Sequence, residues 1–466
     1  MNKQKNIIIL DSHYKTRTFL ECFKNYKISL VYVNPYEKKL SEKYENISNY
    51  LDISDISFFS KKNHKNQTNI FEKYDLSFSY FISLDRRLKL FSEDLCFNYL
   101  NWVGNSYINF LLKNKFDKDS IIFMEPTWAH EILIAKISLK LNLIVSSAMK
   151  CKIFPNRFYY FEGFLNEKIF TKNHNQSNKK YLIFGNSAVN FFLKMNSSES
   201  IYNFNKMAKK NKFNFFLFQR LFLLFREKFN RNYNIFIHNS LFHEVIKKLL
   251  SILRFHYLLI YKNFWNKFND KDNHIKLYFP LHFQPEASID VLGNKFRDQI
   301  KFIKAISNQI KDKNIILYVK EHPHFVGNRK LSFYKNIKRL KSVRLLNPWL
   351  DGRKILNNFD LVISITGTAV YESSFYGVPS VCAVKMYFSS LLIKSSFDPY
   401  KDSILSLLNL IPSWKKFRKS ELWTIELGKI IINSHKGNFG DILNDSHVFE
   451  KSNLILLKRS LHSILK

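Results

Sequence analysis

Threonines and a glycine follow an apolar run in the C-terminal half of the chain. Residues 361–365 read as a buried parallel strand, the turn Thr366–Thr368 follows, and a helix is predicted over residues 369–376. Such a turn points backbone N–H groups, hydroxyls and the positive end of a helix at the carboxyl edge of the sheet, where open α/β sheets bind anions. The alternative is an ordinary strand–turn–helix connection. The residues that we expect to bind the phosphate and the ribose of a nucleotide are Ser364, Thr366, Gly367, Thr368 and Glu372.

A second polar cluster follows the strand predicted over residues 315–319. Lys320 and His322 are two residues apart, so both side chains can project toward one face of the sheet, and Pro323 fixes the backbone after them. A cation and an imidazole beside a phosphate can stabilise the negative charge that develops on a leaving nucleotide. We expect Lys320, Glu321, His322 and Pro323 to bind such a donor; the alternative is a loop histidine with a local hydrogen bond. Metal binding here is not expected, because no acidic or cysteine cluster stands at suitable spacing.

A third segment, from Tyr278 to Glu286, opens the last α/β region and contains two prolines. Polar side chains there would lie at the border between two domains. We expect Gln284 and Glu286 to position a sugar or a phosphate. The alternative is an interdomain linker that the prolines stiffen.

Composition limits the class of protein. The 466 residues favour two or three domains, and a hydrophobic fraction of 46% excludes a disordered polycation despite the net charge of +35. Only 11 glycines and no fixed-period repeat argue against collagen-like, solenoid and propeller folds. The four cysteines lie far apart without metal-binding spacing, which favours a reducing compartment and no metal or cofactor. The sequence shows neither a signal peptide nor a membrane-spanning run, so we expect a cytoplasmic protein.

The order of the predicted elements indicates an α/β fold. An apolar run at residues 7–10, a helix over 16–25 and a strand over 28–33 give the strand–helix–strand order of a parallel sheet. Residues 120–146 repeat the pattern, and the C-terminal half contains it again. Residues 36–75 are polar and weakly periodic, and we expect loops and short elements there.

The three polar segments together resemble the capsular polysaccharide synthesis family and related surface-carbohydrate proteins, including β-Kdo transferases. The matching text is YFPLHFQPEAS, LYVKEHPHFVGNRK and LVISITGTAVYESSFYGVPSV, all within residues 278–381. The resemblance implies a GT-B glycosyltransferase fold, with two Rossmann-like domains that face a cleft. In relatives that use CMP-activated sugars, a His-Pro motif and a Ser/Thr-rich turn bind the nucleotide. The resemblance therefore implies donor binding by His322, Pro323, Ser364, Thr366, Thr368 and Glu372.

The domain organisation expected on this basis has four parts. They are an N-terminal Rossmann-like acceptor domain over residues 1–195, a helical connecting segment over 196–272, a C-terminal Rossmann-like nucleotide-sugar domain over 273–400, and terminal helices over 401–466.

We expect the N-terminal half to bind and activate the acceptor. Residues 123–163 there resemble the same proteins loosely. A GT-B enzyme needs a group that removes a proton from the acceptor hydroxyl or orients it. We expect Glu125, directly after a strand, to fill that role first, with Asp11 and His13 after the first strand as further catalytic candidates beside His322. Glu131 is expected to be a surface or capping charge. Arg157 would hold an anionic acceptor or donor; the alternative is an ordinary surface arginine.

A basic, aromatic segment over residues 206–231 remains outside these motifs. Phenylalanines and leucines are flanked there by lysines and arginines. This composition suits peripheral contact with an anionic membrane, and equally a buried interdomain helix with solvated ends. Nucleic-acid binding is not expected, because the cations flank a solid apolar block and no nucleic-acid-binding motif is found.

These observations favour a metal-independent glycosyltransferase. It would move a sugar from a nucleotide-activated donor, with CMP-Kdo favoured by the resemblance, to a surface-polysaccharide or lipid-linked acceptor. Two alternatives stay open: a polyol-phosphate transferase that uses a CDP-activated donor, and a non-catalytic scaffold of a capsule assembly complex.

Overall fold

In a computed structural model of the chain, the structure describes residues 6–10, 16–32, 41–53, 67–85, 87–171, 176–196, 241–261, 264–269, 271–284, 286–439 and 446–465. These residues form two compact units. Unit 1 holds the described residues up to 171 and from 433 onward, and unit 2 holds those from 176 to 432. The candidates Asp11 and His13 and the basic segment 206–231 lie outside the described residues.

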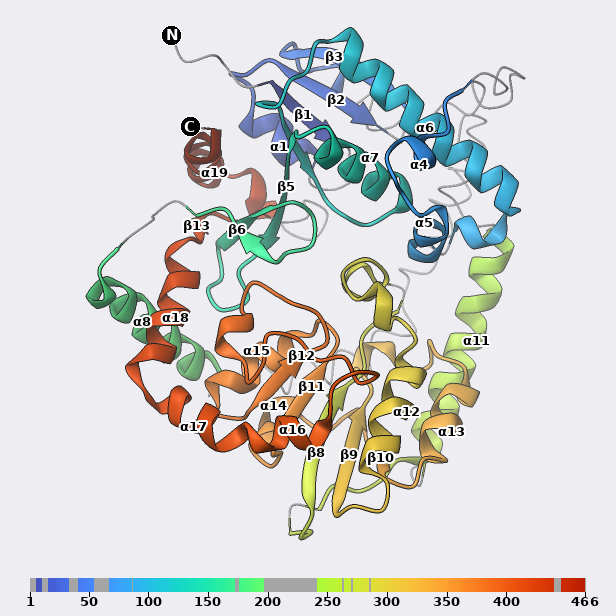
Figure 1. Ribbon diagram of the computed structural model, residues 1–466, viewed down its shortest axis with the longest axis vertical. Helices are drawn as coiled ribbons and strands as arrows, with labels where there is room; N and C mark the ends of the chain where they lie inside the picture. The colour runs from blue at the N-terminus through green and yellow to red at the C-terminus, as the bar shows by residue number, and fades with distance from the viewer. Residues whose placement is uncertain are drawn as a thin grey trace. The chain divides into compact units, whose positions relative to one another are not determined.

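Unit 1 is built on a mixed sheet with the strand order β13-β6-β5-β4-β1-β2-β3, and β7 pairs with β6 (Figure 1). Neighbouring strands from β3 to β5 are parallel, whereas β6 is antiparallel to β5, β7 and β13. The strands are β1 (Ile7–Leu10), β2 (Ile28–Tyr32), β3 (Ile47–Asp52), β4 (Ile121–Met124), β5 (Ile144–Lys150), β6 (Arg157–Glu162), β7 (Lys168–Ile169) and β13 (His435–Lys436). The α-helices are α1 (Thr16–Cys22), α4 (Ile70–Lys73), α5 (Phe78–Leu84), α6 (Glu93–Lys113), α7 (Ala129–Lys140) and α19 (Lys451–Leu465).

Burial explains which strands of unit 1 the sequence could predict. All four residues of β1 and all four of β4 are buried, as the apolar runs of central parallel strands require. Among the loops and short elements expected over residues 36–75 is β3, a six-residue strand at the sheet edge that was not predicted individually. Its first four residues alternate between half-buried and exposed, so no apolar run marks it.

Helix α7 begins at Ala129, and Glu131 lies in its first turn. Glu131 does cap the helix, since its Oε2 accepts hydrogen bonds of 2.8 Å from the N–H groups of Thr127 and Trp128. Of the two roles expected for Glu131, a surface charge or a capping charge, the structure has the capping role. The side chain is buried, and burial raises its pKa well above the ordinary range, although these two bonds act against the shift.

Unit 2 contains an all-parallel sheet with the order β10-β9-β8-β11-β12 (Figure 1). Its strands are β8 (Ile275–Pro280), β9 (Ile315–Lys320), β10 (Val343–Leu346), β11 (Leu361–Ser364) and β12 (Ser380–Cys382). Its α-helices are α8 (Asn178–Asn196), α11 (Leu241–Ile260), α12 (Gln299–Ile310), α13 (Leu331–Lys338), α14 (Gly352–Leu356), α15 (Thr368–Phe375), α16 (Ile404–Asn409), α17 (Ile411–Lys419) and α18 (Glu421–Ile432). The chain leaves β8 toward one edge and returns to add β11 on its other side, so the topological switch point lies between β8 and β11. The predicted α/β class with two Rossmann-like sheets is confirmed.

Alternation along the central strands of unit 2 separates a core face from a second face. Leu277 and Phe279 of β8 pack with Leu317 and Val319 of β9 in the main apolar core, which includes Phe302 of α12. The residues between them point the other way because side chains alternate along a strand. Lys320 and Ser364, at the ends of β9 and β11, therefore belong to the second face.

Glycines mark both ends of α15. Gly367 is its N-cap residue, and Gly377 follows its end with a left-handed φ of 76°. The N–H of Val378 then bonds back to the carbonyl of Ser373 at 3.0 Å, as in a Schellman C-cap.

Two glycines allow α8 and α18 to cross closely. A Cβ on Gly428 of α18 would lie 1.9 Å from the carbonyl oxygen of Tyr181, and one on Gly185 of α8 would lie 2.1 Å from that of Thr424. Both obstacles are backbone atoms, which cannot turn aside as a side chain can. The helix pair therefore needs glycine at both positions.

Replacing Gly428 should destabilise unit 2. We expect Gly428→Ala to lower the free energy of unfolding by about 3 kcal/mol, because overpacking outweighs the higher helix propensity of alanine. Urea denaturation monitored by far-ultraviolet circular dichroism measures the loss. Gly352→Ala is the matched control, since its nearest obstacle is the hydroxyl of Tyr278 at 3.7 Å. Equal stability of the two variants would contradict the close crossing.

Candidate functional site

The carboxyl ends of β8, β9 and β11 bring the predicted segments together in unit 2. Lys320 pairs in register with Pro280, and Val362 with Tyr278, which places Ser364 level with Pro280. Because β8 lies between β9 and β11, the backbones of Lys320 and Ser364 are two strand spacings apart, about 10 Å. Polar residues from three strands thus meet at the switch point.

His282, just after β8, is hydrogen-bonded to the turn after β11. The N–H of Ile365 donates to His282 Nε2 at 3.2 Å, so this nitrogen carries no proton. The hydroxyl of Ser364, 2.7 Å from the same nitrogen, must then donate as well. Ser364 Oγ in turn accepts from the N–H of Gly367 at 3.0 Å. The ring, the serine and the turn form one connected unit.

The His282 ring is neutral and has one donor left. Burial, with the positive charge of Arg329, lowers the pKa of His282 to about 3. With Nε2 accepting, the single ring proton lies on Nδ1. Among the described residues Nδ1 has no hydrogen-bond partner. Its N–H is therefore available to a ligand at the switch point.

A buried ion pair holds the backbone of this histidine. Arg329 Nε donates to Glu321 Oε2 at 2.6 Å, and its Nη2 donates to the carbonyl of His282. The hydroxyl of Tyr334 donates to the same carboxylate oxygen at 3.0 Å. Gln299 adds a bond of 2.9 Å from the N–H of His282 to its Oε1. Glu321, predicted to bind the donor, is fully buried among these partners, and its placement suits a positioning role.

Lys320 is the buried cation of the site. It is only 6% exposed, and its ammonium has no hydrogen bond to any described residue. Burial lowers its pKa to about 8, although the carboxylates of Glu321 and Asp351 act in the opposite direction. The side chain is therefore still charged at neutral pH, in a position where an anionic ligand would relieve the cost of burying it.

His322 is neutral in this setting. Burial, and then the charges of Lys320 and His324, lower its pKa to about 4. Its Nδ1 accepts from the N–H of His324 at 3.2 Å, and its ring packs edge-on against Phe283 at 4.5 Å between centroids. The local hydrogen bond of the alternative interpretation is present. Any contact of this ring with a phosphate would be a hydrogen bond and not a charge interaction.

The turn after β11 is tightly packed. Thr366 is 6% exposed, and its buried Oγ1 has no partner among the described residues. A Cβ on Gly367 would lie 2.4 Å from Ser364 Oγ and 3.0 Å from Cε1 of His282, so only glycine fits there. Thr368 is half-buried as the first residue of α15. Glu372 is paired with Arg353, whose Nε lies 3.1 Å from its carboxylate.

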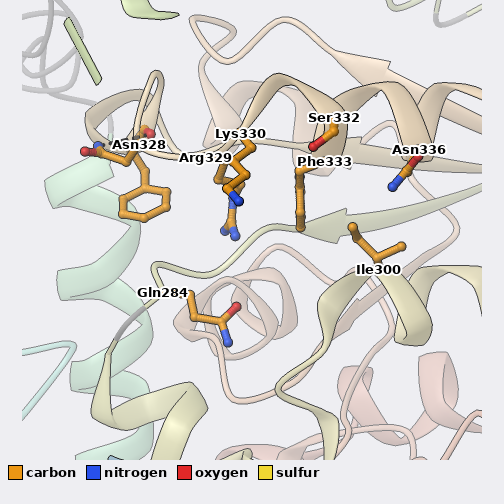
Figure 2. A pocket seen from close by; sticks show the side chains of 9 residues that line it. Gln284, Ile300, Asn328, Arg329, Lys330, Ser332, Phe333 and Asn336 are labelled. Carbon is orange, nitrogen blue, oxygen red and sulfur yellow. Dashed lines mark hydrogen bonds between the residues drawn. The ribbon is translucent and has the colours of Figure 1, made fainter. Parts of the chain in front are cut away.

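Gln284 lines a pocket of about 380 Å³ whose lining includes no residue of this turn. Figure 2 shows Gln284 on one side of it and Arg329 with Phe333 on the other. The Gln284 amide donates to the carbonyl of Arg297 at 3.0 Å and accepts from Gln299 at 3.2 Å. Of the predicted donor-binding residues, Gln284 alone is among those that line this pocket: Gln284, Ile300, Phe325, Asn328, Arg329, Lys330, Ser332, Phe333 and Asn336.

The remaining predicted residues lie elsewhere. Glu286 is exposed, with its carboxylate 2.8 Å from the hydroxyl of Ser288. In unit 1, Glu125 directly follows β4 and is half-buried. Arg157 Nε donates to the Ser434 hydroxyl at 2.7 Å, and its Nη2 donates to the Ser434 carbonyl. That guanidinium joins β6 to the segment before β13.

Sequence reasoning missed the side chains that organise the site. His282 stands in the quoted YFPLHFQPEAS text but was not selected. Arg329 and Gln299 carried no signal, because their roles depend on contacts with residues 47 and 17 positions away. A histidine directly after a buried strand is the feature that could have pointed to His282.

Other features bear on the class of protein. All four cysteines are buried and free. Within the described ranges, no helix combines the length and the apolar character needed to cross a bilayer. No cluster of three or more histidine, cysteine or acidic side chains suited to a metal ion occurs in the same ranges.

Comparison with known proteins gives distant structural likenesses. No family model matches the sequence, and no curated protein does. The structure is similar to KpsC β-Kdo 2,7 transferase from Thermosulfurimonas dismutans, with 11% identity, 78% of this chain and 89% of that chain covered, and a TM-score of 0.34. It is similar to Anabaena Alr3699/HepE in complex with UDP and glucose, with 11% identity, 99% of both chains covered and a TM-score of 0.26. It is also similar to UDP-GlcNAc 2-epimerase from Neisseria meningitidis bound to UDP-GlcNAc, with 10% identity, 92% and 98% covered and a TM-score of 0.25. Identities and TM-scores this low carry no functional assignment.

Proposed function

We propose that this protein is a GT-B-type glycosyltransferase that takes a sugar from a CMP-activated donor and transfers it to a surface-polysaccharide or lipid-linked acceptor. One observation supports it above the others. At the switch point of the unit 2 sheet, three side chains of buried residues each have a polar atom without a hydrogen-bond partner among the described residues: His282 Nδ1, the Lys320 ammonium and Thr366 Oγ1. Of the three atoms, Thr366 Oγ1 is itself buried. Leaving the polar atoms of buried residues unpaired is costly, so their occurrence at one sheet edge favours a site for an anionic ligand.

The three groups suit a phosphate in complementary ways. Lys320 supplies the positive charge, whereas the His282 N–H and the Thr366 hydroxyl can donate hydrogen bonds to phosphate oxygens. The first N–H groups of α15 lack partners inside the helix and add the positive end of its dipole. Together they would stabilise the charge that grows on a departing nucleotide.

The transfer step forms one bond and breaks one bond. The acceptor oxygen forms a bond to the anomeric carbon of the sugar, and the bond from that carbon to the donor phosphate oxygen breaks, with its electron pair leaving on CMP. A base takes the proton of the acceptor hydroxyl. We assign that role to Glu125, which follows β4 at the carboxyl end of the unit 1 sheet. The phosphate charge is balanced by Lys320 and the start of α15.

The choice of nucleotide rests on the sequence. The His-Pro segment and the Ser/Thr-rich turn resemble those of proteins that use CMP-activated sugars, and they are the segments that supply Lys320, His322 and Thr366. A CDP-activated polyol phosphate would present the same kind of phosphate to the same groups. The reaction assay below therefore includes both donors.

A thermal-shift panel tests the proposal. We expect CMP to raise the melting temperature in a concentration-dependent way, with UMP, ADP and GMP giving smaller shifts, because a ligand that binds only the folded state stabilises it. Hydrolysis of CMP-Kdo but not of CDP-glycerol would then support the sugar donor. Hydrolysis of CDP-glycerol alone would instead support the alternative activity, polyol-phosphate transfer. If no nucleotide shifts the melting temperature and no donor is consumed, the catalytic proposal fails and a scaffold role is favoured.

A further inference from the structure

The helix α11 has apolar side chains on two opposite faces. On its packed face, Phe255 and Leu258 are buried in the core of unit 2. Ser251 donates to the side chain of Asn328 at 3.1 Å, and the helix backbone lies so close to Gly327 that a Cβ there would meet the Ser251 carbonyl at 2.5 Å. This face of α11 packs against the rest of unit 2.

The opposite face is apolar and exposed. Six large hydrophobic side chains recur at spacings of three or four residues, and their exposed fractions range from 39% to 80%. At 100° per residue they fall within an arc of about 100° on the side away from Phe255, and they extend over about 21 Å of helix. We call this set the α11 outer face: Ile246, Leu249, Leu250, Leu253, Tyr257 and Ile260.

An exposed apolar stripe of this kind indicates a binding surface. Single apolar side chains at the surface are ordinary, but a contiguous apolar stripe marks a surface that contacts a protein or a lipid. The helix lies at the right of Figure 1, along the edge of unit 2. Elsewhere in unit 2, Ile183 of α8 and Leu422 of α18 are each 62% exposed, and they serve as controls below.

The charges around the stripe point to an anionic partner. From Ile246 to Tyr261 the sequence contains Lys247, Lys248 and Arg254 and no acidic residue. Lys247 and Lys248 are exposed. Lys247 and Arg254 lie about 90° to 110° around the helix from the centre of the stripe, on one flank of it, whereas Lys248 lies about 150° from the centre. Self-association through this face would bring like charges of two copies together. An anionic bilayer instead offers apolar chains to the stripe and negative headgroups to the cations.

We propose that α11 lies in the interface of an anionic lipid bilayer, with its outer face among the acyl chains and its cations at the headgroups. This contact is separate from the nucleotide site, and it would hold the protein beside a lipid-linked acceptor. The segment 206–231, whose composition suits peripheral contact with an anionic membrane and equally a buried interdomain helix, precedes α11 in the sequence.

Vesicle co-sedimentation tests the proposal with the full chain. We expect phosphatidylglycerol-containing vesicles to bind at least tenfold more protein than pure phosphatidylcholine vesicles at low salt. The double variant Leu249→Asp/Leu253→Asp should lose at least tenfold in binding. The matched control Ile183→Asp/Leu422→Asp changes side chains of similar exposure on α8 and α18, and it should bind as the unchanged chain does.

Two further readouts separate the outcomes. Lys247→Glu/Lys248→Glu/Arg254→Glu keeps the stripe and should remove the preference for anionic vesicles. CMP-induced thermal shifts should be the same in all variants, so failure of the nucleotide site and failure of membrane binding are distinguishable. Equal loss of vesicle binding in the α8/α18 control, or no binding by the unchanged chain, would overturn the proposal. A dimer in light scattering that Leu249→Asp/Leu253→Asp converts to a monomer, without vesicle binding, would make the outer face a contact between copies.

Discussion

Lys320→Met should lower donor turnover by about 10²–10³-fold, the loss typical when one preorganised group that stabilises transition-state charge is removed. The same change should raise the free energy of unfolding at pH 7. Burial holds the pKa of Lys320 at about 8 against 10.5 for an ordinary lysine, so keeping the side chain charged in the folded state costs about 3 kcal/mol. Single-turnover kinetics and urea denaturation measure the two effects. Their opposite directions distinguish a binding cation from a structural one.

The pH dependence follows from the same pKa. In the proposed reaction the protonated form of Lys320 stabilises the leaving phosphate, so turnover should fall as pH rises through about 8. Stability changes in the opposite direction: between about 8 and 10.5 the unfolded chain holds more protons at this side chain than the folded chain, so the unchanged protein gains stability with rising pH. The stability advantage of Lys320→Met should shrink over that window.

Lys276→Met is the matched control for this prediction. Lys276 is also buried, but it lies at the opposite end of the sheet in β8, where its ammonium donates to the carbonyl of Asp272 at 2.9 Å. It should leave donor turnover unchanged. Equal losses of donor turnover in both variants, or unchanged turnover in Lys320→Met, would show that Lys320 is not part of the site.

Arg329→Met should lower the free energy of unfolding by about 3–5 kcal/mol, because it leaves the fully buried carboxylate of Glu321 without its ion-pair partner. It also removes the donor to the His282 carbonyl, so the nucleotide shift in melting temperature should shrink as well. Urea denaturation with and without CMP measures both effects.

A double variant gives this prediction its internal check. Arg329→Met/Glu321→Gln removes both charges and should recover part of the lost stability, since replacing a whole buried ion pair costs less than breaking one. Lys295→Met breaks the ion pair between Lys295, which is largely exposed, and Asp398. It should lower the free energy of unfolding by less than about 1 kcal/mol. If Arg329→Met is no more harmful than Lys295→Met, the buried pair does not hold the site.

The sequence predicted the parts of the fold that local patterns determine. The apolar run of β11 and the small-residue turn after it lie within residues 361–368, and each acts through neighbouring backbone groups. The α/β class followed from the same kind of pattern. The edge strand β3 was missed because its side chains are only partly buried.

The candidate site was harder to predict, because its key contacts are between distant residues. Lys320, Glu321 and His322 were grouped as donor ligands, yet alternation along the strand sends the Glu321 side chain to the other face, where it meets Arg329 and Tyr334. Strict use of this two-residue period would have separated them. The bond between His282 and Ser364 joins positions 82 apart, and no local rule gives it.

The tight fit of Gly367 sets a boundary for anyone who wishes to retune the donor preference. Any side chain at this position would push against Ser364 and His282 together, so a mutagenesis library should leave it fixed. Thr368 follows it as a half-buried residue at the start of α15 and is the better place to introduce diversity. Selection for a new sugar would then act beside the proposed donor site, while the hydrogen bonds that join His282, Ser364 and Gly367 preserve the conformation of the turn.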